Sequence, residues 1–490
     1  MPRFIRARFL LPMSDALGRD QRIEDGYAVW DGDTLIEVGA YSAEVGERLV
    51  RVLGPALEVV GPATVQRGVS DVSALVRHEG VLMPGFVKAH GHDHEPPIIG
   101  LVKDVALTGW LDGVVNPFTG FMKEEQGRLC DLLGRTPQSV AYLKARVDDL
   151  YYGITTSMVH HCNHSKYFAD DLVAAAEQAG TRMIVAVGGQ DRHYASDLLD
   201  TVDGALARLD DYRERHGHKA RVTIIPGPDQ LFSNGPEMMT ALKAWAREHG
   251  TLLHFHSSEE KATTAWFRET YGVTPIAYAH GLGILDSRTV IAHQVHSTDE
   301  DLDILAKTGA KIVHNPLANT ILGSGMPPVV EMLERGIPVA ISTDGSGSAD
   351  NQNILAAARL ASQYQKARYS RADYLPAQRV LEMITVEAAR ILDVAAGSLE
   401  PGRPADLVVV ATDTPNMTPT RVTNVVENLV WASDGSEVRV VVGGGEVLRQ
   451  GATFHTLDVA RILADVSTLS AEFDAWRVTA PIVRGTGANA

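Results

Sequence analysis

Histidine is concentrated at the ends of short apolar runs in the middle of this 490-residue chain. In a β-strand, residues two apart point to the same side, so His90 and His92 in "AHGHDHE" can reach one metal ion together. Neutral imidazole is a good ligand for Zn²⁺ or Fe²⁺. Eleven of the 18 histidines occupy such positions: His90, His92, His94, His160, His161, His164, His254, His256, His293, His296 and His314. The pattern predicts a metal site built from several strand ends.

Further groups could complete such a site. "LHFHSSE" places His256 at a strand end and Glu259 three residues later. "IAHQVHS" supplies His293, and "ISTDGSGS" supplies Asp344 at the end of the last run. Three histidines and one aspartate leave an open position for water, which a catalytic metal site needs. Asp344, Glu259 and His293 then fit three roles: accepting the proton of water, delivering a proton to the substrate, and polarising the attacked atom.

We expect one metal ion rather than two. A binuclear site of this kind needs a bridging ligand, usually a carboxylated lysine on a middle strand, and the runs 182–190 and 221–230 contain no lysine. Lys166 and Lys219 lie outside the strand ends, and we expect them at the surface because lysine is rarely buried.

Eight apolar runs position these residues. They end at His90, His161, Gly189, Gln230, Glu259, Ser297, Asn319 and Gly345. Stretches with helical spacing and a terminal glycine, such as "KYFADDLVAAAEQAG", separate them. Eight alternations over about 270 residues are typical of a (β/α)₈ TIM barrel, whose strands converge at their C-terminal ends on one face. The alternative, an open dinucleotide-binding sheet, lacks a G-x-G-x-x-G after the first strand.

Composition limits the partners. The chain has 45 Lys and Arg against 61 Asp and Glu, a net charge of −16, which disfavours nucleic-acid binding. We find no run of about 20 apolar residues, so we expect no membrane span. The two cysteines, Cys130 and Cys162, cannot form a disulfide framework. Nothing resembles a secretory signal, and we expect a cytoplasmic protein.

The motifs "PGFVKAHGH", "HFHSSE", "AHQVHS", "HNPLANTILGSG" and "STDGSG" resemble the amidohydrolase superfamily. Within it they are similar to the branch of cytosine and guanine deaminases, S-adenosylhomocysteine deaminases and s-triazine hydrolases. The resemblance implies one Zn²⁺ or Fe²⁺, with Glu259 as proton shuttle and His293 at the attacked centre of the substrate. The ligands that it implies are His90, His92, His256 and Asp344.

The resemblance also implies the domain organisation. Strands at both ends of the chain, such as the hairpin around Asp31-Gly32-Asp33, would form a small β-sandwich beside the barrel. We expect its N-terminal part at 1–80, the barrel at 81–393, its C-terminal part at 394–455, and a helix and tail at 456–490. A homodimer or higher homo-oligomer is expected from the same resemblance.

Several loops depart from the family pattern. Ala318 stands where "HNPxSN" has serine, "PGPDQ" replaces a Pro-His sequence after the fourth strand, and the second strand ends in "HHCNH". These loops hold the candidates for substrate contact, whose alternatives are helix packing and loop capping: Trp110, His160, His161, Asp229 and Gln230. Asp229 and Gln230 could hydrogen-bond the edge of a planar ring.

Together these features predict hydrolytic deamination of an amino-substituted purine, pyrimidine, pterin or triazine. An alternative keeps the same machinery with another leaving group, either chloride or an alkylamine from an s-triazine, or hydrolyses an acyclic amidine. The third possibility is a non-catalytic binding protein, which the complete set of ligands and proton-transfer residues disfavours.

Overall fold

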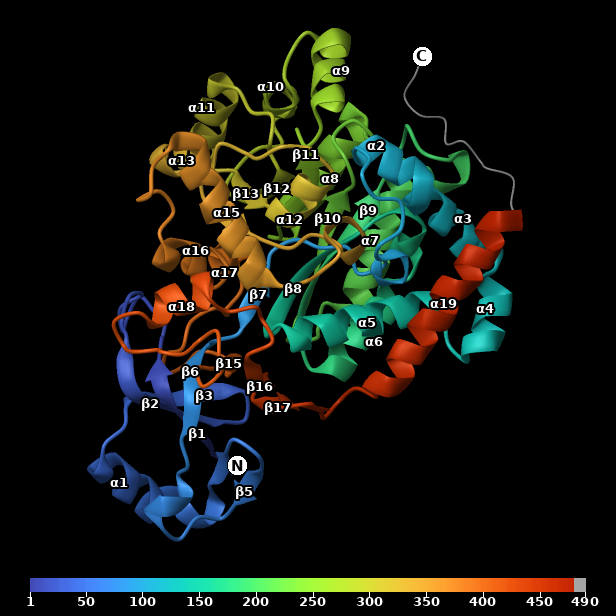
Figure 1. Cartoon of the computed structure of the whole chain (residues 1–490). Helices are drawn as coiled ribbons and strands as arrows, with labels where there is room; N and C mark the ends of the chain where they lie inside the picture. Colours follow the sequence, from blue (N-terminus) through green and yellow to red (C-terminus); the bar gives the residue numbers. More distant parts are fainter. Residues whose placement is uncertain (480–490) are drawn as a thin grey trace.

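The computed structural model describes residues 1–479, so the tail predicted beyond them lies outside the described residues. Two parallel four-stranded sheets form its centre (Figure 1). The first, in the order β10-β9-β8-β7, consists of β7 (Phe86–Lys88), β8 (Ile154–His161), β9 (Arg182–Gly189) and β10 (Val222–Pro228). The second, in sequence order, consists of β11 (Leu253–Ser257), β12 (Thr289–His293), β13 (Lys311–His314) and β14 (Val339–Ile341). Each of the eight apolar runs therefore contains a strand.

The two sheets meet at both of their edges. At one junction Gln230, just after β10, forms an isolated parallel bridge with His256. At the other, Ser342 Oγ accepts a hydrogen bond from His90 N at 3.0 Å and donates one to His90 O at 2.7 Å. The architecture is of the TIM-barrel type, but strand pairing does not close it into one continuous sheet. Instead, the Ser342 side chain joins the segments that directly follow the short strands β7 and β14.

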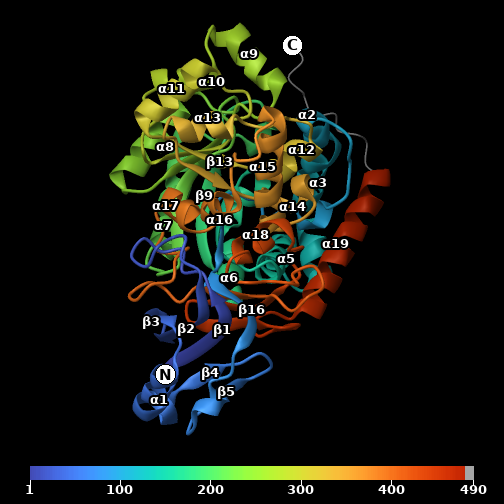
Figure 2. The same ribbon diagram turned by 60° about the vertical axis from the view of Figure 1, so that its left-hand side comes forward.

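Helices surround these sheets (Figures 1 and 2). In chain order they are α5 (Pro137–Tyr151), α6 (Ala169–Ala179), α7 (Val202–His216), α8 (Pro236–Glu248), α9 (Lys261–Tyr271), α10 (Pro275–Gly281), α11 (Asp299–Thr308), α12 (Pro316–Ile321), α13 (Val329–Glu334), α14 (Ser346–Ala349), α15 (Ile354–Tyr369), α16 (Ala377–Met383) and α17 (Val386–Ile391). Local sequence explains the ends of α11. Thr298 and Asp301 form a reciprocal capping box at its start, and Gly309 takes a positive φ of 73° at its end.

The barrel centre is filled by small and branched apolar side chains. Val87, Met158, Ile225, Val290 and Val313 belong to one buried cluster beneath the strand ends. This packing leaves the C-terminal ends of the strands as the place where polar side chains can gather.

Segments from both ends of the chain form one ten-stranded sheet below the barrel in Figure 1. Its main path is β18-β17-β16-β15-β6-β1-β2-β3, and the predicted hairpin joins β2 to β3. Its strands are β1 (Arg3–Leu10), β2 (Ile23–Asp31), β3 (Thr34–Ala40), β4 (Glu58–Val60), β5 (Val65–Arg67), β6 (His78–Pro84), β15 (Leu407–Ala411), β16 (Val438–Gly443), β17 (Glu446–Gln450) and β18 (Thr453–Phe454), with helix α1 (Ala43–Leu53) packed against it. Helix α18 (Val425–Trp431) packs against α15 and α16. The pairings describe a single sheet, and a sandwich of two facing layers stays a prediction.

A helical segment follows β7 and borders the strand ends. It comprises α2 (Leu107–Trp110), a π-helical turn (Leu111–Val115), α3 (Asn116–Glu124) and α4 (Gln126–Leu133). The C-terminal helix α19 (Val459–Thr479) packs against it, with Phe473 in contact with Phe118 and Phe121 (Figure 1). Among the described residues we find no helix with the length and apolar character of a membrane span.

Candidate metal centre

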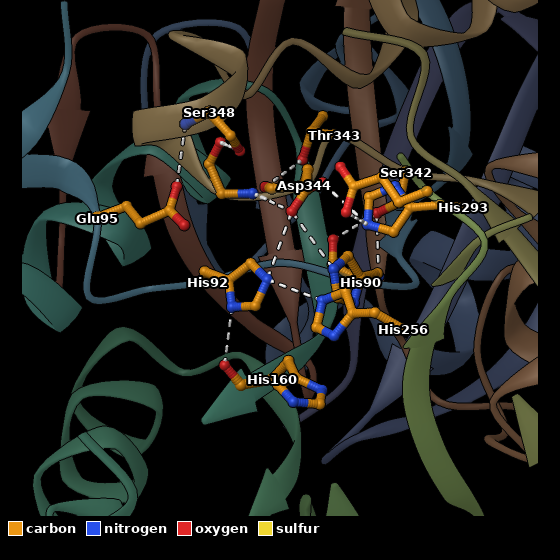
Figure 3. A network of polar contacts seen from close by, with 12 residues as sticks. His90, His92, Glu95, His160, His256, His293, Ser342, Thr343, Asp344 and Ser348 are labelled. Atoms are coloured by element: carbon orange, nitrogen blue, oxygen red, sulfur yellow. Dashed lines mark hydrogen bonds and ion pairs between the residues drawn. The ribbon is translucent and has the colours of Figure 1, made fainter. Parts of the chain in front are cut away.

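The Nε2 atoms of His90, His92 and His256 point to one place at the strand ends (Figure 3). Each Nδ1 contacts a neighbouring group of the protein, so each Nε2 faces the common point. The contacts are His90 Nδ1 with His254 Nε2 at 2.8 Å, His92 Nδ1 with the His160 carbonyl at 3.1 Å, and His256 Nδ1 with the Asp229 carbonyl at 2.5 Å. Such contacts orient metal-binding imidazoles and fix which nitrogen is free to coordinate.

The free nitrogens and Asp344 have the spacing of a ligand set. His92 Nε2 lies 3.2 Å from His256 Nε2. Asp344 Oδ1 lies 3.3 Å from His90 Nε2 and 3.6 Å from His92 Nε2. Tetrahedral Zn²⁺ with bonds of about 2.0–2.1 Å separates its ligand atoms by roughly 3.3 Å. His90 Nε2 is buried and has no hydrogen-bond partner among residues 1–479, as expected of an atom reserved for a cation.

The charges of these histidines suit coordination. Burial lowers the pKa of His90 and of His92 well below 6.5, and the neighbouring imidazoles lower each further. Both rings are therefore neutral at pH 7, which leaves a lone pair available for a metal ion.

Asp344 and His293 reach this point through unusual backbone conformations. Their φ angles are +72° and +76°, in the left-handed region that non-glycine residues seldom adopt. Gly345 N donates a hydrogen bond to Asp344 Oδ1 at 2.8 Å, which holds that carboxylate. Asp344 Oδ2 lies 3.7 Å from His293 Nε2. Such backbone outliers concentrate at functional sites, where the surrounding structure holds them in place.

Glu259, His293 and Asn319 form a short chain beside the ligands. Glu259 Oε2 lies 3.4 Å from His293 Nε2, and Asn319 Nδ2 donates to His293 Nδ1 at 3.0 Å. An acceptor role for Nδ1 places the ring proton on Nε2, towards Glu259 and Asp344. Burial raises the pKa of Glu259 well above 4.5, and the charge of Asp344 raises it further. Sequence analysis assigned no role to Asn319, although it lies within the quoted "HNPLANTILGSG" motif.

A pocket opens over the cluster. Three of the predicted substrate contacts, Trp110, Asp229 and Gln230, line it. Other polar lining groups received no substrate role from the sequence: His94, Glu95, Cys162, Asn163, Tyr194 and Ser348. Glu95 is held by the amides of Gly347 and Ser348, and burial raises its pKa to about 8.

Two predicted contacts, His160 and His161, are absent from the pocket lining. Successive residues of a strand face opposite sides, so His161 points away from the barrel interior and bonds the Tyr142 hydroxyl at 2.7 Å. His160 faces the barrel interior but lies behind the residues that line the pocket. Its Nε2 is 3.5 Å from Asp229 Oδ1. The alternation explains why only one of the two neighbours approaches the site.

The expectation of a surface position for Lys166 is wrong. This side chain is fully buried, and its Nζ donates to Asp200 Oδ2 at 2.7 Å. The ion pair compensates the cost of burying the ammonium group.

A buried ionic network lies behind the ligand strand β7. Lys88 Nζ contacts Asp149 Oδ1 at 2.8 Å and Asp93 Oδ1 at 3.3 Å. Arg146 contacts the second oxygen of each carboxylate, which balances two cations with two anions. Because Lys88 and Asp93 flank His90 and His92 in sequence, the network anchors both ends of the "KAHGHD" segment.

Comparisons with known proteins identify the family of the chain. The model of the amidohydrolase family matches residues 81–448. The chain is 31% identical to a 5-methylthioadenosine/S-adenosylhomocysteine deaminase of Nitratidesulfovibrio vulgaris, over 88% of this chain and 92% of that one. It is 29% identical to a 5'-deoxyadenosine deaminase of Methanothermobacter thermautotrophicus, over 80% of this chain and 87% of that one.

Solved structures share the fold. A zinc-bound adenosine deaminase from Xanthomonas campestris superposes with a TM-score of 0.81 at 21% identity, covering 96% of this chain and 98% of that one. A zinc complex of atrazine chlorohydrolase from Arthrobacter aurescens gives 0.82 at 22% identity, covering 96% of this chain and all of that one.

Proposed function

Because this chain belongs to the amidohydrolase family, we propose that it is a metal-dependent aminohydrolase that releases ammonia from an amino-substituted nitrogen heterocycle. The observation that carries the proposal is a group of close ligand atoms: Asp344 Oδ1 lies near the Nε2 atoms of His90 and His92, and His92 Nε2 lies near His256 Nε2. Glu259 and His293 lie beside this group. This arrangement combines a cation site with two further groups able to hold or move a proton.

The residues proposed to hold the cation are His90, His92, His256 and Asp344. Three of the distances between their ligand atoms, His92 to His256, His90 to Asp344 and His92 to Asp344, are 3.2 to 3.6 Å and fit one tetrahedral ion, with Zn²⁺ first and Fe²⁺ second. When bound, the ion supplies Lewis-acid activation of a water molecule. Zinc in the two structural neighbours supports this choice.

We assign the proton transfers to side chains according to their positions. Asp344 Oδ2 faces His293 rather than the other histidines and can accept the proton of the attacking water. Glu259 favours its protonated form because it is buried, so it can deliver a proton to the ring nitrogen beside the attacked carbon. His293, with its proton on Nε2, can donate a hydrogen bond at the attacked centre.

Trp110, Asp229 and Gln230 are proposed to bind the substrate ring. Trp110 offers an aromatic face. Its buried Nε1 has no hydrogen-bond partner in the described part of the chain, so it can donate to an acceptor on the ring. Asp229 can accept from a ring N–H. The relatives named as deaminases of adenosine derivatives place 6-aminopurines first among the substrates to test.

We also propose the finer organisation expected from the sequence. It comprises a closed (β/α)₈ barrel at 81–393, a β-sandwich from 1–80 and 394–455, and a C-terminal segment at 456–490. Family resemblance suggests a homodimer or higher homo-oligomer, and we propose a cytoplasmic location from the sequence, in which nothing resembles a secretory signal. Light scattering on the purified protein measures the oligomeric state directly.

The test is ammonia release by the Zn²⁺-loaded protein over amino-purines, pyrimidines, pterins and triazines, with Asp344→Asn as the inactive control. Release by the wild type alone supports deamination and identifies the ring class. Chloride or alkylamine release from a triazine, without ammonia, would replace deamination by the alternative leaving group. No turnover in the metal-loaded protein, over triazines and acyclic amidines as well, would contradict the proposal.

A further inference from the structure

A second group of side chains able to bind a metal lies on the far side of His92 and His256, away from Asp344. The rings of His92 and His256 are nearly parallel, with an interplanar angle of 7°. Their Nε2 atoms face the first site near Asp344, and their Nδ1 atoms face the other way. There, Cys162 Sγ lies 4.0 Å from His92 Nδ1, and Asp229 Oδ1 lies 3.7 Å from His256 Nδ1.

His160 completes this group. One ring nitrogen of His160, the sulfur of Cys162 and one carboxylate oxygen of Asp229 all lie within 4.8 Å of one another, and all three side chains are buried. His160 Nε2 is already 3.5 Å from Asp229 Oδ1. A Zn²⁺ ion with bonds of about 2.0–2.3 Å holds its ligand atoms roughly 3.3–3.7 Å apart, so only the sulfur needs to move appreciably.

The hydrogen bonding of His160 independently points to a missing ligand. Neither of its ring nitrogens has a hydrogen-bond partner within the described part of the chain, although the side chain is fully buried. Buried polar groups are ordinarily paired. Asp229 Oδ2 accepts a hydrogen bond from the Tyr194 hydroxyl, and Asp229 Oδ1 is directed to His160.

We propose that His160, Cys162 and Asp229 form a second cation site, which takes a borderline or soft divalent cation such as Zn²⁺ or Cd²⁺ through one nitrogen, one sulfur and one oxygen. Sequence alternation supports the geometry, because His160 and Cys162 are two residues apart at the end of β8. On binding, the thiol of Cys162 loses its proton to solvent and coordinates as thiolate. Cys162 and Asp229 also line the pocket, so a cation here lies within reach of the substrate.

This site is distinguishable from the first by its sulfur ligand. The first site has only nitrogen and oxygen donors, whereas thiolate bound to Cd²⁺ gives an ultraviolet charge-transfer band. Cys130, on α4, is the other cysteine of the chain and does not line the pocket. Measurements in a Cys130→Ser background therefore assign the band to Cys162.

The experiment titrates the full-length Cys130→Ser protein, freed of metal by chelation, with Cd²⁺. Bound Cd²⁺ is counted by elemental analysis while the band is recorded. We expect two equivalents per chain and a thiolate band. When Cys162→Ser is added, we expect the band to disappear and one bound Cd²⁺ per chain to be lost. The Cd²⁺ that remains bound at the first site shows that the variant is folded.

Asp229→Asn provides a second variant, because it keeps the thiol and the backbone carbonyl that contacts His256. We expect this substitution to raise the Kd of the Cd²⁺ ion that produces the band by at least tenfold. An unchanged Kd, or one equivalent without any band in the Cys130→Ser protein, overturns the second site and leaves the proposed function intact. A protein that binds no Cd²⁺ at all contradicts the second site and the first together.

Discussion

The two halves of the barrel contribute different chemistry to the same pocket. Strands β11–β14 and the loops after them supply the residues proposed for proton transfer: Glu259, His293 and Asp344. Strands β7–β10 and their loops supply most of the polar or aromatic wall: His94, Glu95, Trp110, Cys162, Asn163, Tyr194, Asp229 and Gln230. The proposed metal ligands are divided equally, two from each half. From these proposed roles we expect the second half to carry the proton transfers and the first half to select the substrate.

The strongest test of this division is Glu259→Gln in the second half. Glutamine keeps the size of the side chain but cannot transfer a proton, so we expect kcat to fall by about 10²–10⁴-fold with little change in KM. Steady-state kinetics and zinc content measure the effect, and zinc should remain at wild-type stoichiometry. A kcat close to that of the wild type would remove Glu259 from the proton transfer.

Asn319→Ala tests a positioning residue in the same half. Loss of its hydrogen bond frees His293 to take the other tautomer, and we expect kcat to fall by about 10–100-fold. The pH profile of kcat should shift as well, which a purely structural role would not produce. Asn315→Ala is the matched control, because its side-chain amide makes no hydrogen bond within residues 1–479. Equal effects of the two substitutions would contradict the role of Asn319.

Asp229→Asn tests whether the first half of the barrel, with strands β7–β10, binds the substrate. We expect KM to rise by roughly tenfold with a smaller change in kcat, because a hydrogen bond from the substrate to a charged acceptor is worth about 1.5–3 kcal/mol. The order of preference among ring classes should also change. A loss confined to kcat would transfer Asp229 from substrate binding to the chemical step and break the comparison between the halves.

His314 ends β13 in the second half but does not line the pocket, so its substitution should change stability and leave catalysis alone. Burial lowers its pKa from 6.5 to about 3. The unfolded state therefore binds a proton more readily, and the contribution of neutral His314 is present above pH 6.5 and is lost as pH falls towards 3.

We expect the free energy of unfolding of His314→Gln to decline less steeply than that of the wild type across this window. Urea unfolding at a series of pH values measures the difference. Parallel pH dependences for the two proteins would contradict the assigned pKa.

Local patterns in the sequence were sufficient to predict the strands and to propose many residues of the site. The spacing of His90 and His92 places both on one face of a strand end, and each of the eight apolar runs contains a strand. Alternation also explains why His161 faces away from His160, but which of the two faces inward depends on the register of β8 against β9. Lys166 was misjudged because its partner Asp200 lies 34 residues away.

The sequence by itself predicted a metal site with groups for proton transfer, because ligand spacing and carboxylate positions at strand ends are local properties that survive in any correctly paired barrel. The resemblance of its motifs to a known family added the prediction of deamination. Tertiary structure alone decided which side chains meet across strands. Cys162 and Asp229 belong to β8 and β10 segments separated by more than sixty residues, and Tyr194 reaches Asp229 from the intervening loop. Sheet order and packing determine these contacts, and no periodicity along the chain encodes them.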